Sequence, residues 1–192
     1  MEKVNSILQR LAEYAKINKV PIVSSDALDI IVRVVEEVQP KSVLELGTAI
    51  GYSTLVMASA MPLGGRIVSI ELEAERADMA RSAVESAGLA ERVSILQGDA
   101  AEVLLRLGDE FDLVFIDAAK AQYPHYLAMV KPLLANRACI IADNVLFRGW
   151  VEGTEPYPRR FRTIVKRLKA YLNIVMTEKE YNTVLYRVGD GV

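Results

Sequence analysis

Apolar residues follow two different spacings along the chain, and the spacing changes at Pro40. Before Pro40 they recur every three or four positions, which predicts amphipathic helices. The first predicted helix spans residues 4–15, and the second, capped by Ser25 or Asp26, continues to Val38. The N-terminal region is therefore expected to form two helices.

After Pro40, short runs rich in Val, Ile and Leu alternate with segments of helical spacing. Nearly continuous apolar runs are typical of strands buried on both faces of a parallel sheet. The alternation predicts a doubly wound α/β fold, with a Rossmann-like, mostly parallel sheet and helices on both faces. The predicted strands are SVLEL (42–46), RIVSIE (66–71), VSILQGD (93–99), FDLVFID (111–117) and ACIIADN (138–144), and the predicted helices lie near residues 53–60, 73–87, 99–107, 123–134 and 161–172.

The length and composition indicate how many domains the chain forms and in which compartment it is found. With 192 residues, 52% of them hydrophobic, we expect one domain over residues 1–192, made of N-terminal helices (1–39) and a Rossmann-like core (40–192). The single Cys139 excludes an internal disulfide bond, and its apolar neighbours indicate a buried, unreactive thiol. No apolar run approaches the roughly 20 residues of a membrane span, and the first residues lack a signal-peptide core. We expect a cytoplasmic protein with no membrane association.

Each predicted strand finishes at or near an acidic residue. Ligands bind at the carboxyl ends of the strands in such a sheet. A single acid there is explained by turn chemistry, since turns favour Asp, but five in the same position favour a ligand site. These acids are Glu45, Glu71, Asp99, Asp117 and Asp143.

The turn after the first strand reads GTAIG, residues 47–51. A dinucleotide site prefers a second Gly that lets the backbone approach a pyrophosphate, and Ala49 takes its place here. No Lys-Ser/Thr pair follows, so the turn is not a P-loop either. Glu71 can accept from both hydroxyls of a ribose, and Glu45 would favour a cationic group. A nucleoside without phosphate but with a positive charge describes S-adenosylmethionine (SAM).

Five motifs lie within residues 44–149, in a likeness that runs from about Val20 to Gly189: LELGTAIGYST, IVSIE, ILQGDA, FIDAAKAQY and ADNVLFRG. Together they resemble the class I, metal-dependent O-methyltransferases, the group of the catechol and caffeoyl-CoA O-methyltransferases. Within that group, GTAIGYS, FIDAAKAQY, DNVLFRG and the late VGDG are most similar to bacterial tRNA 5-hydroxyuridine methyltransferases. The resemblance implies a class I SAM methyltransferase fold.

The resemblance also implies which residues hold SAM. They would be Val23 ahead of the core, Glu45, Gly47 and Ser53 around the turn, Glu71 at the ribose hydroxyls, Asp99 and Ala100 at the adenine, and Asp117, which would face both SAM and a metal ion.

A metal site is expected from Asp117, Asp143 and Asn144. Two carboxylates and one amide oxygen form a hard, all-oxygen ligand set, which favours Mg²⁺, or Mn²⁺ or Ca²⁺, over Zn²⁺. Asp143-Asn144 alone would be interpreted as a strand-end turn. Lys120, three residues after Asp117, can take the proton of the hydroxyl that is methylated, the alternative being a solvated loop lysine. The only histidine, His125, is expected at the surface or in packing.

The expected chemistry needs an acceptor with two adjacent oxygens, which both catechols and 5-hydroxyuridine provide. The net charge of −2 does not decide between them, but one predicted helix is strongly basic. Such a stretch suits phosphate contacts, although it is also compatible with a solvated helix face. We expect tRNA as the acceptor, with a small catechol or other phenol as the alternative. The basic residues are Arg159, Arg160, Arg162, Lys166, Arg167 and Lys169.

The C-terminal edge of the sheet departs from the family pattern. In the family, a motif like VGDG links two antiparallel strands, and here TVLYRV (183–188) can be the first of them. The sequence ends at Val192, so the closing edge strand is expected to be missing; either the sequence is truncated, or that edge is built differently or completed by a partner. An incomplete edge invites pairing, which favours a homodimer.

Two other classes of protein remain as alternatives. A nicotinamide-dependent reductase would need pyrophosphate contacts that the turn lacks. A non-catalytic nucleic-acid-binding domain would need the basic stretch but neither Lys120 nor the metal ligands.

Overall fold

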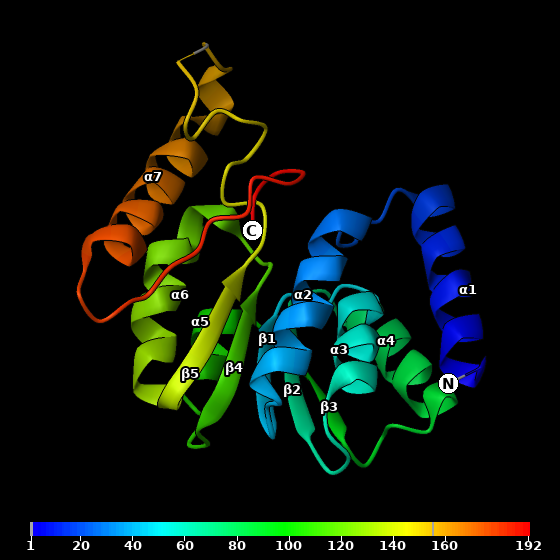
Figure 1. Cartoon of the computed structure of the whole chain (residues 1–192). Helices are drawn as coiled ribbons and strands as arrows, with labels where there is room; N and C mark the ends of the chain where they lie inside the picture. The colour runs from blue at the N-terminus through cyan, green and yellow to red at the C-terminus, as the bar shows by residue number, and fades with distance from the viewer. Residues whose placement is uncertain (1, 155) are drawn as a thin grey trace.

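A five-stranded sheet forms the centre of the protein (Figure 1). The structure is a computed structural model that describes residues 2–154 and 156–192. The strand order is β3-β2-β1-β4-β5 and every neighbouring pair is parallel, so all carboxyl ends meet at one edge of the sheet. The predicted α/β fold is confirmed. The strands are β1 (Ser42–Leu46), β2 (Arg66–Glu71), β3 (Val93–Gln97), β4 (Phe111–Ile116) and β5 (Leu134–Ala142).

Helices cover both faces of the sheet, as the apolar runs predict. On one face lie α2 (Ser25–Val38), α3 (Tyr52–Ala60) and α4 (Ala74–Ala87), with α1 (Glu2–Asn18) packed against α3 and α4. On the other face lie α5 (Ala100–Leu104), α6 (Tyr123–Val130) and α7 (Arg162–Thr177). Three short 3₁₀ turns complete the described elements: η1 (Lys120–Gln122), η2 (Lys131–Leu133) and η3 (Arg159–Phe161). In the described ranges, no helix combines the length and apolar character needed to cross a membrane.

Helix boundaries depart from the predicted ones where local chemistry competes with the apolar pattern. The cap of α2 is Ser24, not Ser25 or Asp26, because Ser24 has the extended backbone of a cap and its side chain accepts from the backbone N–H of Ala27. α5 ends early because the next residues bond to carbonyls three positions back, as in a 3₁₀ turn. α6 gives way to η2 at Pro132, which lacks an N–H.

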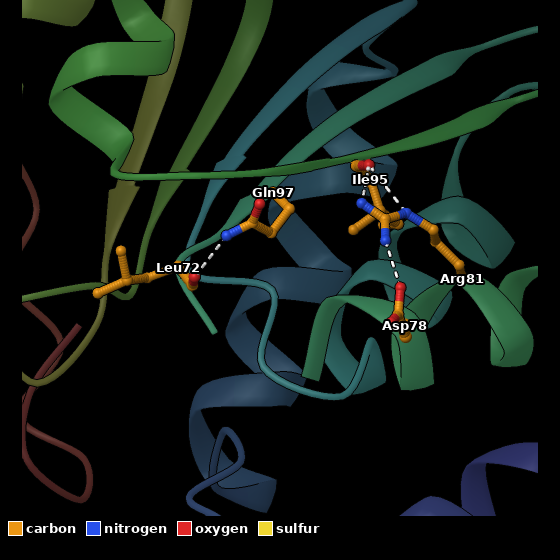
Figure 2. A network of polar contacts seen from close by, with 5 residues as sticks. All are labelled: Leu72, Asp78, Arg81, Ile95 and Gln97. Carbon is orange, nitrogen blue, oxygen red and sulfur yellow. Dashed lines mark hydrogen bonds and ion pairs between the residues drawn. The ribbon is translucent and has the colours of Figure 1, made fainter. Parts of the chain in front are cut away.

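Edge strand β3 is fastened to α4 by a polar network (Figure 2). The guanidinium of Arg81 donates to the carbonyl of Ile95 at 3.2–3.3 Å and pairs with Asp78 at 2.6 Å. Nearby, the amide of Gln97 donates to the carbonyl of Leu72 at 3.0 Å, which ties the carboxyl end of β3 to the turn after β2. The contact with Ile95 satisfies a backbone carbonyl of the edge strand, and the contact with Leu72 satisfies one in the turn after β2.

The other edge of the sheet, at β5, is open to a groove of about 530 Å³. The segment 180–186 forms its far wall, and α2 and α7 close its sides. Among the residues that the structure describes, no strand lies between segment 183–188 and β5, and the strand expected at 183–188 is not formed. Instead Tyr186 and Val192 exchange two backbone hydrogen bonds, of 2.8 and 3.0 Å, across the Gly189–Gly191 turn. A homodimer formed over this edge stays a prediction.

Candidate functional site

The glycine turn after β1 is packed directly against the carboxyl end of β4. Gly47 and Gly51 have left-handed backbones, with φ of 97° and 88°. A Cβ atom at Gly47 would lie 2.1 Å from the carbonyl oxygen of Asp117, so no side chain fits there. The turn is therefore in contact with one of the predicted metal ligands.

Glu71 holds this turn in place. Its Oε2 accepts from the backbone N–H of Ala49 at 2.7 Å and its Oε1 accepts from that of Glu73 at 3.0 Å. Ala49 has a φ of 47°, an uncommon value for a residue other than glycine. Glu71 is 6% exposed, and its free lone pairs can accept from ribose hydroxyls. Sequence reasoning predicted the ribose contact but missed the clamp on the turn.

Glu45 lies beneath the turn with no exposed surface. Its carboxylate accepts from the hydroxyls of Ser53, Thr54 and Ser69. Burial raises the pKa of Glu45, and the three hydroxyl bonds act in the opposite direction. The carboxylate therefore anchors the first turn of α3, which carries Ser53, and direct contact of Glu45 with a cofactor stays a prediction.

The three remaining residues expected at SAM lie around the same edge of the sheet. Val23 is buried just ahead of α2. Asp99 caps α5, since its Oδ1 accepts from the N–H groups of Ala101 and Glu102 at 2.9 and 3.3 Å. Cap chemistry thus accounts for the position of Asp99, and an adenine contact by Asp99 and the buried Ala100 stays a prediction.

Asp117 and Asp143 follow the neighbouring strands β4 and β5 and act on each other electrostatically. Asp143 is 3% exposed, and its Oδ1 accepts from the N–H of Asn144 at 2.7 Å. Burial, and then the charge of Asp117, raise the pKa of Asp143 to about 6. The Nζ of Lys120 lies 3.3 Å from Asp117 Oδ1. The structure thus brings both predicted carboxylates and the predicted base together.

The donor set of this cluster fits a hard cation. Over residues 2–154 and 156–192 there is no group of three or more His, Cys, Asp and Glu that could hold a metal, and the predicted set has only two carboxylates. Its third donor is the amide of Asn144, a residue type that tolerates the left-handed φ of 57° found there. Two carboxylates and an amide leave positions for water and substrate oxygens, as is usual for Mg²⁺.

Tyr123 contacts the backbone at the ends of the two strands that carry this cluster, and it is not among the predicted site residues. Its buried hydroxyl lies 2.8 Å from the carbonyl of Asp143 and 3.1 Å from that of Ile116, so it bridges the ends of β4 and β5. Its ring meets Tyr171 of α7 edge to face, at 5.6 Å between centroids. Tyr123 lies inside the FIDAAKAQY motif, but its role depends on contacts between strands that the sequence does not reveal.

An aromatic and arginine cluster follows Asn144 in the connection between β5 and α7. Trp150 stacks against Tyr157 at 5.9 Å and lies 5.2 Å from Phe161. The guanidinium of Arg148 lies 5.6 Å from the Trp150 ring, and that of Arg160 lies 4.7 Å from the Phe161 ring. Such a surface can stack on flat rings, and sequence reasoning assigned it no role.

The basic stretch lies on the surface of η3 and α7, and all six side chains are exposed. Arg162, Lys166 and Lys169 follow the spacing i, i+4, i+7 and share one face of α7, while Val165 and Leu168 pack into the core. None of the six forms an ion pair with another described residue. His125 is exposed, as expected.

Comparisons with known proteins agree with this geometry. A catechol O-methyltransferase of Niastella koreensis is 39% identical over 137 residues, which cover 66% of this chain and 62% of that protein. One of Mycobacterium tuberculosis is 38% identical over 115 residues, 59% of this chain and 52% of that protein. The chain thus spans only about half to three fifths of these relatives.

Solved structures of O-methyltransferases match more of the chain. The O-methyltransferase from Bacillus cereus in complex with SAH has a TM-score of 0.80 and 29% identity, covering 91% of this chain and 80% of that one. TomG from Streptomyces achromogenes, in complex with SAM, has a TM-score of 0.80 and 28% identity, covering 90% and 78%. The sequence model of the family described as O-methyltransferase matches residues 3–192. With that match, and with the strand-end site in the place where this fold binds its ligands, the chain belongs to the O-methyltransferase family.

Proposed function

We propose that this protein is an O-methyltransferase that uses SAM and a divalent cation and methylates one of two vicinal oxygens. The observation that carries this proposal is the contact of Gly47 with the carbonyl of Asp117. It puts the glycine turn beside the residue that carries one of the two carboxylates, so a cofactor held by the turn would lie next to an acceptor oxygen held by a cation. The structures with SAM and SAH named above support the choice of cofactor.

Some residues of the chain would bind the cation and the cofactor, and one would accept a proton. When bound, SAM supplies an activated methyl group and the cation favours the ionised form of the acceptor hydroxyl. Asp117, Asp143 and Asn144 would hold the cation, with Tyr123 fixing the strand ends that carry them. The Nζ of Lys120, beside Asp117, would accept the proton of the hydroxyl. The clamped turn would hold the methyl donor in line with that oxygen.

Two acceptors fit this chemistry, and different observations favour each. The catechol O-methyltransferases among the relatives support a small catechol or related phenol. The basic face of α7 supports 5-hydroxyuridine in tRNA, because a polyanion is held by exposed cations that have no partner among the described residues. The aromatic and arginine cluster beside Asn144 suits the flat ring of either acceptor.

The variant Glu71→Ala is expected to weaken SAM binding by about 10-fold to 100-fold, because hydrogen bonds to a charged group are lost. It removes acceptors for the ribose and also releases the N–H of Ala49. Isothermal titration calorimetry measures the change. Glu73→Ala is the matched control, since Glu73 is an exposed acid two residues away whose side chain caps nothing. Equal affinity for wild type and Glu71→Ala would overturn the ribose assignment.

Reversing the charge of basic residues on α7 tests whether the acceptor is tRNA or a small catechol. If tRNA is the acceptor, changing Arg162, Lys166 and Lys169 to Glu should raise its Michaelis constant and lower the salt dependence of binding by about one for each lost contact. SAM affinity and catechol turnover should stay unchanged. Steady-state kinetics with hydroxyuridine-containing tRNA and with a catechol, at several salt concentrations, measure both effects.

The matched control for this variant is a triple charge reversal on α1, at Lys3, Arg10 and Lys16, which are also exposed. It changes the net charge equally but leaves α7 intact. If both triple variants weaken tRNA binding equally, the effect belongs to net charge and not to α7. If the protein turns over catechol efficiently and does not methylate the tRNA, the small-phenol alternative holds.

A further inference from the structure

Four successive backbone N–H groups after Asn144 are bound by one distant turn, the segment Gly189–Gly191. Val145 donates to the carbonyl of Gly191 at 3.1 Å. Leu146 and Phe147 donate to the carbonyl of Asp190 at 2.8 and 3.2 Å. The fourth contact is different in kind, since the N–H of Arg148 donates to the side-chain Oδ1 of Asp190 at 3.0 Å.

The bound segment has a backbone that needs such support. Phe147 and Arg148 have φ of 40° and 60°, in the left-handed region that residues other than glycine rarely adopt. Two such residues in succession persist only where their surroundings hold them. The carboxylate of Asp190 holds the second of them, and with it the direction in which the chain leaves Asn144.

The turn that carries Asp190 is itself closely fitted to the segment. A Cβ atom at Gly191 would lie 2.5 Å from Cγ of Leu146, and Gly191 has a φ of 85°. A Cβ atom at Gly189 would lie 3.5 Å from Oγ of Ser24, next to Val23. The VGDG motif therefore joins the segment after the metal ligands to the N-terminus of α2.

We propose that Asp190 is a positioning residue for the acceptor end of the site. This inference rests on the proposed function. Its carboxylate fixes the backbone of Arg148, so that the amide of Asn144 faces the cation site and the rings of Phe147 and Trp150 form one acceptor surface. Asp190 touches no reacting atom. It acts through the segment 144–150.

The variant pair Asp190→Ala and Asp190→Asn tests the proposal. Asp190→Ala loses the bond to Arg148, so the Michaelis constant for the acceptor should rise about 10-fold, with a smaller change in kcat and none in SAM affinity. Asp190→Asn keeps an oxygen at the same place and should restore most of the wild-type constant. No change in Asp190→Ala, or an equal defect in both variants, would overturn the positioning role.

Two measurements do not depend on methyl transfer, so they keep this inference separate from the proposed function. Trp150 is the only tryptophan, and it lies 5.8 Å from Phe147, so its fluorescence reports on the segment. Asp190→Ala should shift its emission to the red and increase quenching by acrylamide. In the wild type, the amide of Arg148 should be protected from hydrogen exchange although the residue is exposed. An unprotected Arg148 amide would overturn the proposal even if the variant failed to fold.

Asp112→Ala is the matched control. The Oδ2 of Asp112 accepts from the N–H groups of Lys41 and Ser42 at 2.8 and 3.0 Å, a clamp of the same kind at the amino ends of β1 and β4. Its loss should lower stability without moving the Michaelis constant or the Trp150 emission. An equal shift of both in Asp112→Ala would show that general destabilisation causes them, and would overturn the specific role of Asp190.

Discussion

Removal of divalent cations with a chelator is expected to abolish methyl transfer, and excess Mg²⁺ is expected to restore it. The physical reason is the pair of Asp117 and Asp143, one partly buried and one buried carboxylate, with the predicted third donor, Asn144, next in the chain after Asp143. A cation there contributes several kcal/mol to the stabilisation of the developing oxyanion. Each 1.4 kcal/mol changes the rate tenfold, so the loss should be about 10²-fold to 10⁴-fold.

Asp143→Asn is the sharpest variant for this prediction. It keeps an oxygen that can accept from the N–H of Asn144 but removes a charge that is buried beside Asp117. Activity and Mg²⁺ affinity should fall while the unfolding temperature does not, which calorimetry and thermal melts measure. Asp78→Asn, at an exposed acid on α4, is the control. Full activity in excess EDTA would contradict the metal requirement and leave catalysis to Lys120 alone.

Replacement of Lys120 is expected to lower kcat by about 10²-fold to 10⁴-fold, the usual contribution of a general base. Two replacements distinguish a base from a positive charge. Lys120→Met removes both, whereas Lys120→Arg keeps the charge beside Asp117 but cannot give up a proton at accessible pH. Both variants should lose activity to a similar extent, while SAM affinity stays unchanged.

Rapid-quench or steady-state kinetics, together with calorimetry for SAM, measure this prediction. Lys131→Met is the matched control, because Lys131 pairs with Glu180 at 2.6 Å on an exposed part of the surface. If Lys120→Arg keeps wild-type kcat, the side chain acts through its charge and another group accepts the proton.

The parallel sheet could be predicted because its strands are buried on both faces. The runs 42–46 and 66–71 coincide with β1 and β2, since most of their residues are buried in the sheet. β5 begins at Leu134, earlier than predicted, because Phe111 pairs with Leu134 across an irregularity in the ladder. α7 extends to Thr177, since Tyr171 and Val175 continue its buried face. The pattern of apolar residues alone does not show which residues contact each other across the fold.

The grouping of three candidate residues could be predicted from their positions at the strand ends. Asp117, Lys120 and Asp143 come together as expected, because they follow neighbouring strands. Contacts that join distant segments could not be predicted. Glu71 clamps the turn at Ala49 and Tyr123 bridges two strand ends, and both are visible only once the strand order is known.

The two contacts that shape the site join residues at different separations along the chain, so one of them can form earlier during synthesis than the other. The clamp from Glu71 to Ala49 spans 22 residues, and the bond between Asp190 and Arg148 spans 42. A chain emerges from the ribosome N-terminus first. The glycine turn and Glu71, which clamps it, are therefore synthesised long before β4, which pairs with β1. The starts of β1 and β4 are about 70 residues apart in the sequence.

Until then, β1 exposes an unpaired edge, which is the kind of surface that attracts other chains. The segment after Asn144 cannot reach its final shape until Asp190 has left the ribosome, because that residue binds the backbone of Arg148. A nascent chain can therefore carry the complete sequence of the glycine turn well before the proposed acceptor end of the site is assembled.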